Sequence, residues 1–176
     1  MKTSNLFLAA GLVFCSISRS TAFAETVVLD SGKEILSQLA LNDLQDKPHH
    51  LDEWYGKVII LNFWATWCGP CQIEIPHLIQ YQSEYVDKGL RVVGIGLDEA
   101  RKLNNYVRTV GINYQVLHAD PQHYSHLLQD WGDTVGVLPY TVVINRSGQP
   151  VYRQAGIFSD EAFNVYVKPL LDTNHF

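Results

Sequence analysis

The sequence predicts one α/β domain in which helices cover a central β-sheet that is parallel in its middle and antiparallel at one side. Three almost unbroken apolar runs, Val58–Trp64, Val92–Leu97 and Tyr140–Ile144, are typical of strands buried on both faces. Between these runs, apolar residues recur at the three- and four-residue spacing of helices. Strands that alternate with helices favour parallel pairing, and a hairpin after the last run adds the antiparallel side.

Four helices are predicted from apolar residues that share one helical face. Asp120-Pro121 is typical of the start of the third helix, since Asp caps helices and Pro suits a first turn. The residues on these faces are Ile75, Leu78, Ile79, Gln82, Tyr85 and Val86, then Leu103, Tyr106, Val107 and Val110, then Tyr124, Leu127, Leu128 and Trp131, and finally Phe163, Tyr166, Val167 and Leu170.

The turns and the N-terminal stretch complete this outline. Asn145-Arg146-Ser147-Gly148 is a turn sequence that joins the third strand to a hairpin partner at Val151–Gln154. Residues 25–39 carry less information, although Val27–Leu29 is compatible with a short strand. No repeat and no linker is visible, so we predict a single domain.

The composition excludes several other classes of protein. Of the 176 residues, 47% are hydrophobic and 18% are charged, and the 12 Gly and 7 Pro follow no period. These values exclude collagen-like, low-complexity and disordered chains. The net charge is −5 and no basic run of five or more occurs. The sequence therefore predicts no binding of nucleic acid or of an anionic membrane surface.

The first residues have the pattern of a cleavable export signal. A lysine precedes the mostly apolar run Leu6–Ile17, and the small residues of Ala22-Phe23-Ala24 predict cleavage directly after them. The run is shorter than a membrane-spanning helix, although an uncleaved anchor stays open. Cys15 follows a bulky residue, which disfavours lipid attachment. We predict a signal peptide over 1–24, a mature domain over 25–176 and a periplasmic location.

The chemistry is concentrated in Trp64-Ala65-Thr66-Trp67-Cys68-Gly69-Pro70-Cys71, which follows a buried strand and opens a helix. Free N–H groups and the positive end of the helix dipole stabilise a thiolate on Cys68. Pro70 suits the first turn because it has no N–H to satisfy. Two intervening residues bring the sulfurs within bonding range, and Cys71, further into the helix, is more shielded. We predict that Cys68 attacks and that Cys71 resolves the mixed disulfide.

A metal site is the alternative interpretation of the two cysteines. Structural zinc needs four ligands, which the spacing of the histidines does not supply. His123 and His126 flank the apolar face of the third predicted helix, His77 lies on the first, and His49-His50 lies in a loop beside Pro48. We expect these histidines at the surface. The sequence predicts no metal and no cofactor apart from the redox-active disulfide.

The stretch Gly56–Cys71, followed by Glu74 and Pro76, resembles the thioredoxin superfamily, and more closely its exported TlpA/ResA-type branch. The likeness extends over roughly residues 40–172. It implies a thioredoxin-like fold with an N-terminal extension and an inserted helix from about Asp98 to Tyr114. Pro76 corresponds to the proline that kinks the first helix of this fold.

The stretch Val137-Leu138-Pro139-Tyr140-Thr141 resembles the family's cis-proline loop. The resemblance implies that Pro139 is cis and faces the cysteine pair, where the backbone of Leu138 can pair with a substrate strand. An ordinary proline at the start of a strand is the alternative. Trp64 is compatible with the core. The residues that we expect to contact the substrate are Trp67, Gly69, Pro70 and Leu138.

Asn62 departs from the thioredoxin pattern. Thioredoxin has a buried Asp six positions before the nucleophile, where it helps to move the proton of the resolving Cys, and an amide cannot titrate. Glu74 matches an active-site Glu of ResA-type proteins, so it is the first candidate base, and Asp98, at the end of a core strand, is the second. The alternatives are a solvated first-turn acid for Glu74 and a helix N-cap for Asp98.

The resemblance implies an exported thiol–disulfide oxidoreductase. We expect a reductase, because Gly-Pro between the cysteines is the pair of thioredoxin, whose potential is about −270 mV against about −120 mV for the oxidant DsbA. We expect a monomer that acts on substrate proteins with disulfides or Cys pairs. A membrane thiol donor of DsbD or CcdA type would recharge it, and this branch often serves cytochrome c maturation.

Other functions stay open at this point. A disulfide oxidase or isomerase would use the same two cysteines, although residues 25–39 make a poor dimerisation region. A copper-handling binding protein usually has a wider cysteine spacing and a distant His, which are absent here. Peroxiredoxins are disfavoured because Thr66 stands two residues before Cys68 rather than three.

Overall fold

The computed structural model describes residues 32–120, 122 and 124–172. The predicted signal peptide and the possible strand Val27–Leu29 lie outside these residues. No helix within the described ranges is long and apolar enough to cross a membrane.

The centre of the molecule is a seven-stranded sheet in the order β2-β1-β5-β4-β3-β6-β7. Strand β3 pairs in parallel with β4, and β4 with β5, whereas the other neighbours are antiparallel. The sheet is thus mixed, as predicted. The strands are β1 (Ala40–Asp43), β2 (Pro48–His50), β3 (Val58–Trp64), β4 (Leu90–Gly96), β5 (Gln115–His118), β6 (Tyr140–Ile144) and β7 (Pro150–Ala155).

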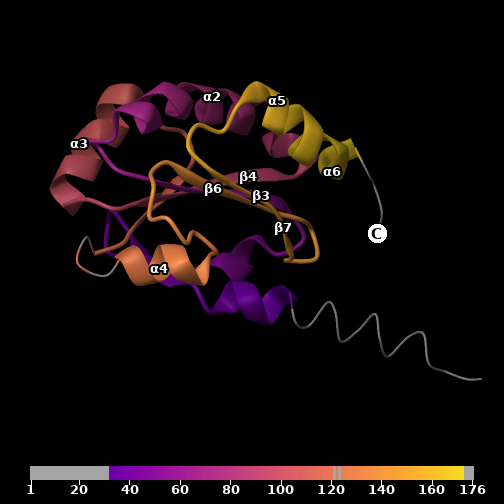
Figure 1. The fold of residues 1–176 in the computed structure, drawn as a ribbon, viewed down its shortest axis with the longest axis horizontal. Coiled ribbons are helices and arrows are strands. Elements are labelled where there is room, and N and C mark those ends of the chain that lie inside the picture. Colours follow the sequence, from indigo (N-terminus) through magenta and orange to yellow (C-terminus); the bar gives the residue numbers. More distant parts are fainter. Residues whose placement is uncertain (1–31, 121, 123, 173–176) are drawn as a thin grey trace, which may run out of the picture.

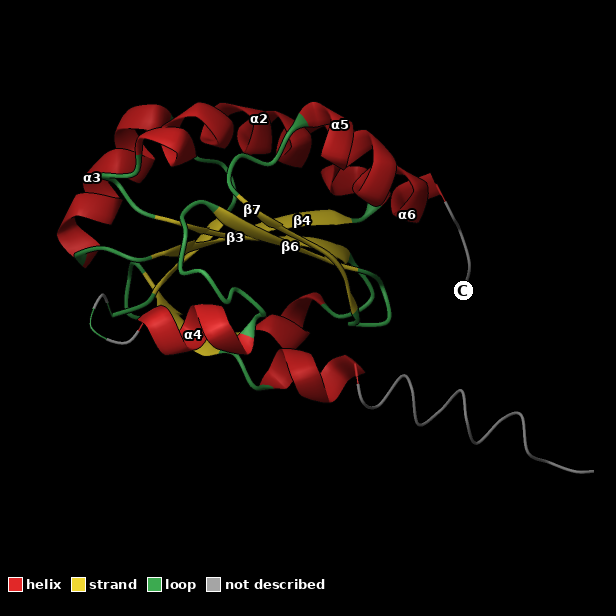
Figure 2. Cartoon of the chain, in the orientation of Figure 1, coloured by secondary structure: helices red, strands yellow, loops and turns green. Residues whose placement is uncertain are grey.

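Helices cover both faces of the sheet (Figures 1 and 2). Helices α2, α3, α5 and α6 lie on one face, and α4 lies on the other together with the helix over residues 32–37. Their bounds are α2 (Gly69–Tyr85), α3 (Ala100–Val110), α4 (Tyr124–Asp130), α5 (Asp160–Ala162) and α6 (Lys168–Asp172), with a π-helical turn (Phe163–Val167) and two 3-10 turns (Leu51–Trp54 and Val86–Lys88).

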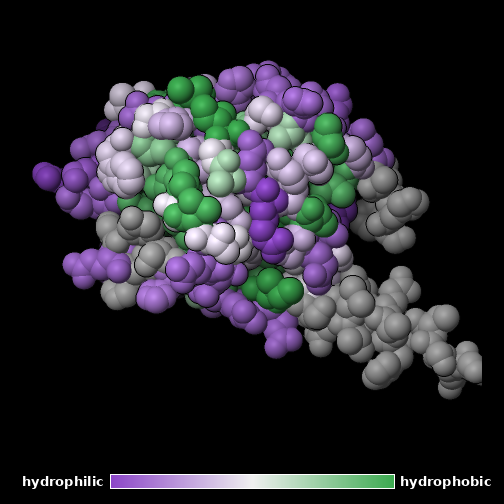
Figure 3. Space-filling view, in the orientation of Figure 1, coloured by the Kyte–Doolittle hydropathy of each residue, from purple (hydrophilic) through white to green (hydrophobic). Residues whose placement is uncertain are grey.

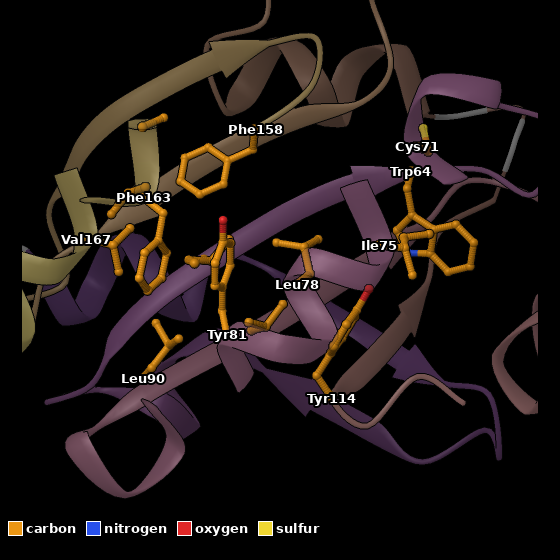
Figure 4. Packing of buried hydrophobic residues seen from close by; sticks show 14 of the residues in the cluster. Trp64, Cys71, Ile75, Leu78, Tyr81, Leu90, Tyr114, Phe158, Phe163 and Val167 are labelled. Atoms are coloured by element: carbon orange, nitrogen blue, oxygen red, sulfur yellow. The ribbon is translucent and has the colours of Figure 1, made fainter. Parts of the chain in front are cut away.

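Strand β3 separates two hydrophobic cores. All of its residues are buried, and alternate side chains point to opposite faces of the sheet. Ile60 and Trp64 pack under α2 with Ile75, while Leu61 and Phe63 pack on the α4 side. Figure 4 shows the α2-side core, where the Tyr81 and Phe163 rings stack with centroids 3.9 Å apart. Asn62 is the one polar position of β3 and falls on the α2 side.

Three strands were missed by the sequence analysis, namely β1, β2 and β5. Each has only three or four residues, and polar side chains interrupt the apolar pattern. They pair at one side of the sheet, with β2 at its edge. The third predicted helix is α4, which begins at Tyr124. Pro121, which the sequence analysis placed in its first turn, lies outside the described residues.

The expectation that His49 is a surface residue in a loop was wrong. It lies on β2 with only 6% of its surface exposed. Its ring lies between two carboxylates, with Nδ1 3.0 Å from Glu53 Oε2 and Nε2 3.2 Å from Asp43 Oδ2. The ring also stacks on Trp54. These polar partners make burial of a histidine favourable.

Candidate active site

Cys68 and Cys71 form a disulfide at the start of α2, with Cα atoms 5.3 Å apart. Cys68 is the N-cap of the helix, and its Sγ accepts a hydrogen bond of 3.2 Å from the backbone N–H of Cys71. Pro70 stands in the first turn, as expected. The exposed fraction is 5% for Cys68 and zero for Cys71, so Cys68 is the sulfur that a partner reaches more easily.

The residues around the disulfide differ sharply in exposure. Trp67 is 64% exposed directly before the nucleophilic position. Gly69 and Pro70 are also exposed, so they can meet a partner. Trp64 is fully buried and belongs to the core, where it packs near Cys71 and Ile75 (Figure 4).

Glu74 lies one helical turn after Cys71 and is completely buried, so the alternative of a solvated first-turn acid was wrong. Its Oε1 accepts a hydrogen bond of 2.5 Å from Asn62 Nδ2, and its Oε2 accepts one of 2.7 Å from the backbone N–H of Phe158. Burial raises the pKa of Glu74 to about 7, although both hydrogen bonds act in the opposite direction. Glu74 can therefore exchange a proton near neutral pH.

Asn62 connects Glu74 to the neighbouring strand. Its amide nitrogen also donates to Thr141 Oγ1 on β6 at 3.0 Å. Tyr114 interacts electrostatically with Glu74. Burial raises the pKa of the Tyr114 hydroxyl, and the Glu74 carboxylate raises it further. Thus the position where thioredoxin has an Asp holds an amide here, and the ionisable group stands on α2 instead.

The peptide bond between Leu138 and Pro139 is cis, as the sequence analysis expected. Pro139 directly precedes β6, in which Tyr140 pairs with Phe63 near the end of β3. Because β3 leads into the segment before Cys68, this register places Pro139 at the same edge of the sheet as the disulfide. Its carbonyl accepts a hydrogen bond of 2.8 Å from Gly156. Leu138 is partly exposed beside it.

Asp133 shapes the loop before Pro139, and the sequence analysis missed it. Its buried carboxylate accepts hydrogen bonds from the N–H groups of Val135, Gly136 and Val137 at 2.8, 3.0 and 3.1 Å. An Asp that leads into a loop with a glycine is a known turn signal and could have revealed this role. Exposed apolar side chains gather over this loop on the face seen in Figure 3.

Asp98 follows β4 and is 5% exposed. It accepts hydrogen bonds from the Thr66 hydroxyl and, at 2.8 Å, from the N–H of Glu99. Burial alone would raise the pKa of Asp98, but these bonds and the Lys102 ammonium at 3.6 Å hold it below its usual value. The N-cap of α3 is Glu99, so the N-cap alternative was wrong. An acid that stays ionised suits the role of second candidate base poorly.

Comparisons with known proteins agree with this geometry. The AhpC/TSA family matches residues 32–152. The protein named "Thiol-disulfide oxidoreductase ResA" from Bacillus thuringiensis (strain Al Hakam) is 30% identical over 149 residues, which are 84% of this chain and 83% of the relative. The chain belongs to the AhpC/TSA family and is a ResA-type thiol-disulfide oxidoreductase. Cys68 and Cys71 are its active-site pair.

Solved structures place this ResA-type oxidoreductase among thioredoxin-like folds, as predicted. A thiol:disulfide interchange protein of the thioredoxin family from Chlorobium tepidum TLS is 32% identical with a TM-score of 0.65, and the match covers 76% of this chain and 92% of that one. A secreted thiol-disulfide isomerase from Corynebacterium glutamicum is 25% identical with a TM-score of 0.66, covering 77% and 84%. Within the described residues, no group of three or more His, Cys, Asp and Glu is arranged to hold a metal ion.

Proposed function

We propose that this oxidoreductase works as an exported reductase of protein disulfides. The observation that carries the proposal is the Gly69-Pro70 dipeptide between the two cysteines, with Cys68 at the helix N-cap. The same dipeptide occurs in thioredoxin, whose pair is strongly reducing. The export-signal pattern over residues 1–24 and the likeness to a secreted relative support an extracytoplasmic location, with 25–176 as the mature domain.

The first step uses the reduced protein. The Cys68 thiolate attacks one sulfur of a substrate disulfide, so a Cys68–substrate bond forms, the substrate S–S bond breaks, and the other substrate sulfur leaves as a thiolate that takes up a proton. The helix N-terminus favours the thiolate form of Cys68. We assign docking of the substrate to exposed Trp67, Gly69 and Pro70 and to the backbone of Leu138 beside cis-Pro139.

The second step releases the product. Cys71 loses its proton and its thiolate attacks Cys68 Sγ, which breaks the mixed disulfide and frees the second substrate thiol. Two electrons have then passed to the substrate, and the protein holds the Cys68–Cys71 disulfide. We assign the proton of Cys71 to Glu74, because its pKa of about 7 suits a base at neutral pH and it stands one turn away on α2.

The cycle requires a dithiol that returns two electrons to the protein. We propose a membrane donor of DsbD or CcdA type for this role and, as substrates, protein disulfides such as the haem-binding Cys pair of an apocytochrome c. We expect the protein to act as a monomer. These assignments rest on the likeness to the exported branch of the family.

The reduction potential of the Cys68–Cys71 pair tests the direction of electron flow. The purified protein is equilibrated in glutathione and dithiothreitol buffers of defined ratio, and the dithiol fraction is counted by alkylation and mass spectrometry. We expect a value near or below about −230 mV. A value of about −120 to −180 mV, the range of DsbA and protein disulfide isomerase, would instead make the protein an oxidase or isomerase.

A further inference from the structure

Thr66, two residues before Cys68, is held from two sides. Its hydroxyl donates a hydrogen bond to the Asp98 carboxylate. Its carbonyl accepts one of 2.8 Å from Gln72 Nε2, in the first part of α2. The segment between β3 and Cys68 is therefore tied both to the end of β4 and to the helix that carries the disulfide.

The Asp98 carboxylate is the buried charge of this arrangement. One oxygen accepts from Thr66, and the other accepts from the Glu99 N–H at 2.8 Å and lies 3.6 Å from Lys102 Nζ. Lys102 and Glu99 pair with each other at 2.6 Å, and both side chains are at least half exposed. Water screens these two opposite charges strongly, whereas it screens Asp98 weakly. The net effect near the nucleophile is a fixed negative charge.

The covalent chain limits how far Thr66 can lie from Cys68. The Cα atoms of Thr66 and Cys68 are at most about 7.6 Å apart, since consecutive Cα atoms are about 3.8 Å apart. The Asp98 carboxylate is hydrogen-bonded to the side chain of Thr66, two positions before Cys68, and a buried negative charge there disfavours a second negative charge on Cys68. A second buried carboxylate near the cysteines is that of Glu74 on α2, which accepts its hydrogen bonds from Asn62 and Phe158.

We propose that Asp98 is a positioning residue for the nucleophile: it anchors Thr66 and opposes the Cys68 thiolate, which keeps the cysteine pair reducing. This inference rests on the proposed role of Cys68 as the attacking thiol. A strong oxidant owes its high potential to a stabilised reduced form. A charge that destabilises the thiolate works in the opposite direction and offsets part of the effect of the helix dipole.

The test is the equilibrium in which the disulfide and two glutathione molecules give the dithiol and one glutathione disulfide. Asp98→Asn removes the charge and keeps a hydrogen-bonding group, so we expect an approximately tenfold shift toward the dithiol, or about 30 mV. Asp98→Glu keeps the charge, and Glu99→Gln removes an exposed charge one position along the chain. We expect both to stay within about twofold of the wild type.

A second pair of variants tests the anchor. Thr66→Val removes the hydroxyl and should slow the reaction of the reduced protein with dithiobis-nitrobenzoate several-fold, while Thr66→Ser should restore the rate. Thermal unfolding at the same pH shows which variants stay folded. Because Asp98→Glu keeps the negative charge, its equilibrium constant separates the effect of the charge from a loss of stability.

Three results would overturn the inference. They are a wild-type equilibrium constant for Asp98→Asn, equal shifts for Asp98→Asn and Asp98→Glu, and an equal shift for Glu99→Gln. The test compares the equilibrium constants of the variants with that of the wild type. Its outcome therefore stays valid even if the wild-type potential contradicts the reductase proposal. Mixed disulfides trapped on Cys71 instead of Cys68 would overturn both.

Discussion

The carboxylate of Glu74 accepts a hydrogen bond of 2.7 Å from the backbone N–H of Phe158, 84 positions later in the chain. This bond joins the helix of the disulfide to the loop after β7. In that loop Gly156 also donates to the carbonyl of Pro139. One buried acid therefore contacts a segment that also supports the cis-proline loop, so its protonation state affects both proton transfer and the stability of the fold.

The first prediction concerns the pH dependence of thiol exchange. Glu74→Gln keeps the shape of the side chain but cannot accept a proton. Because the pKa of Glu74 is about 7, the wild-type rate of resolution should rise as the pH passes through 7, and this rise should be lost in the variant. We expect a loss of about tenfold or more at pH 8. Stopped-flow measurement of mixed-disulfide resolution between pH 5 and 9 gives the profile.

Glu84→Gln is the matched control, because Glu84 stands on the same helix and is exposed. It should reproduce the wild-type profile. If the Glu74→Gln profile also matches the wild type, Glu74 is not the base.

The second prediction concerns stability, and its sign is opposite to that of an ordinary salt-bridged acid. The pKa of Glu74 is raised from 4.5 to about 7 on folding. The folded state therefore binds the proton more tightly, and the free energy of unfolding falls as the pH rises from about 4.5 to 7. The shift corresponds to about 3 kcal/mol at most. Glu74→Gln should avoid this loss, so the variant should gain stability relative to the wild type between pH 5 and pH 8.

Urea unfolding at both pH values measures this difference. If the difference in the free energy of unfolding between the variant and the wild type is the same at pH 5 and pH 8, folding does not raise the pKa of Glu74. The two predictions on Glu74 together describe an acid that costs stability where it is active.

The third prediction separates the roles of the two cysteines. Cys71→Ala leaves the attacking thiol without a resolving partner, so mixed disulfides with substrate proteins should accumulate. Cys68→Ala should abolish disulfide reduction and trap few partners, because Cys71 is fully buried. Non-reducing electrophoresis after acid quenching, followed by mass spectrometry of the linked peptides, identifies the bonded sulfur. Equal trapping by both variants would contradict the assignment.

The parts of the site that the sequence predicted are local in the chain. Cys68, Pro70 and Cys71 lie within one helical turn, so their spacing fixes their geometry. The cis-proline loop was found because its own residues resemble a known loop. In contrast, the bond from Glu74 to Phe158 and the bond from Thr66 to Asp98 span 84 and 32 positions. Periodicity reports which face a residue occupies, and it does not report which distant group meets it there.

The same limit explains the error at His49. Its neighbours Pro48 and His50 are exposed, and the strand has only three residues, so no apolar pattern marked it as buried. Burial depends on Asp43 from β1 and on Glu53 from the following 3-10 turn, which meet the ring only after the first hairpin has formed.

The fourth prediction follows from this cluster. His49→Leu places an apolar side chain at this buried position and leaves Oδ2 of the buried Asp43 carboxylate without the ring nitrogen at 3.2 Å. We expect the free energy of unfolding to fall by about 1–3 kcal/mol at pH 6, the usual cost of an unsatisfied buried polar group. Urea unfolding measures it, with His50→Leu as the control at an exposed neighbouring position. Because this hairpin lies at the far side of the sheet from β6 and β7, the reduction potential should stay unchanged. A shifted potential with unchanged stability would mean that His49 acts on the cysteine pair rather than on the fold.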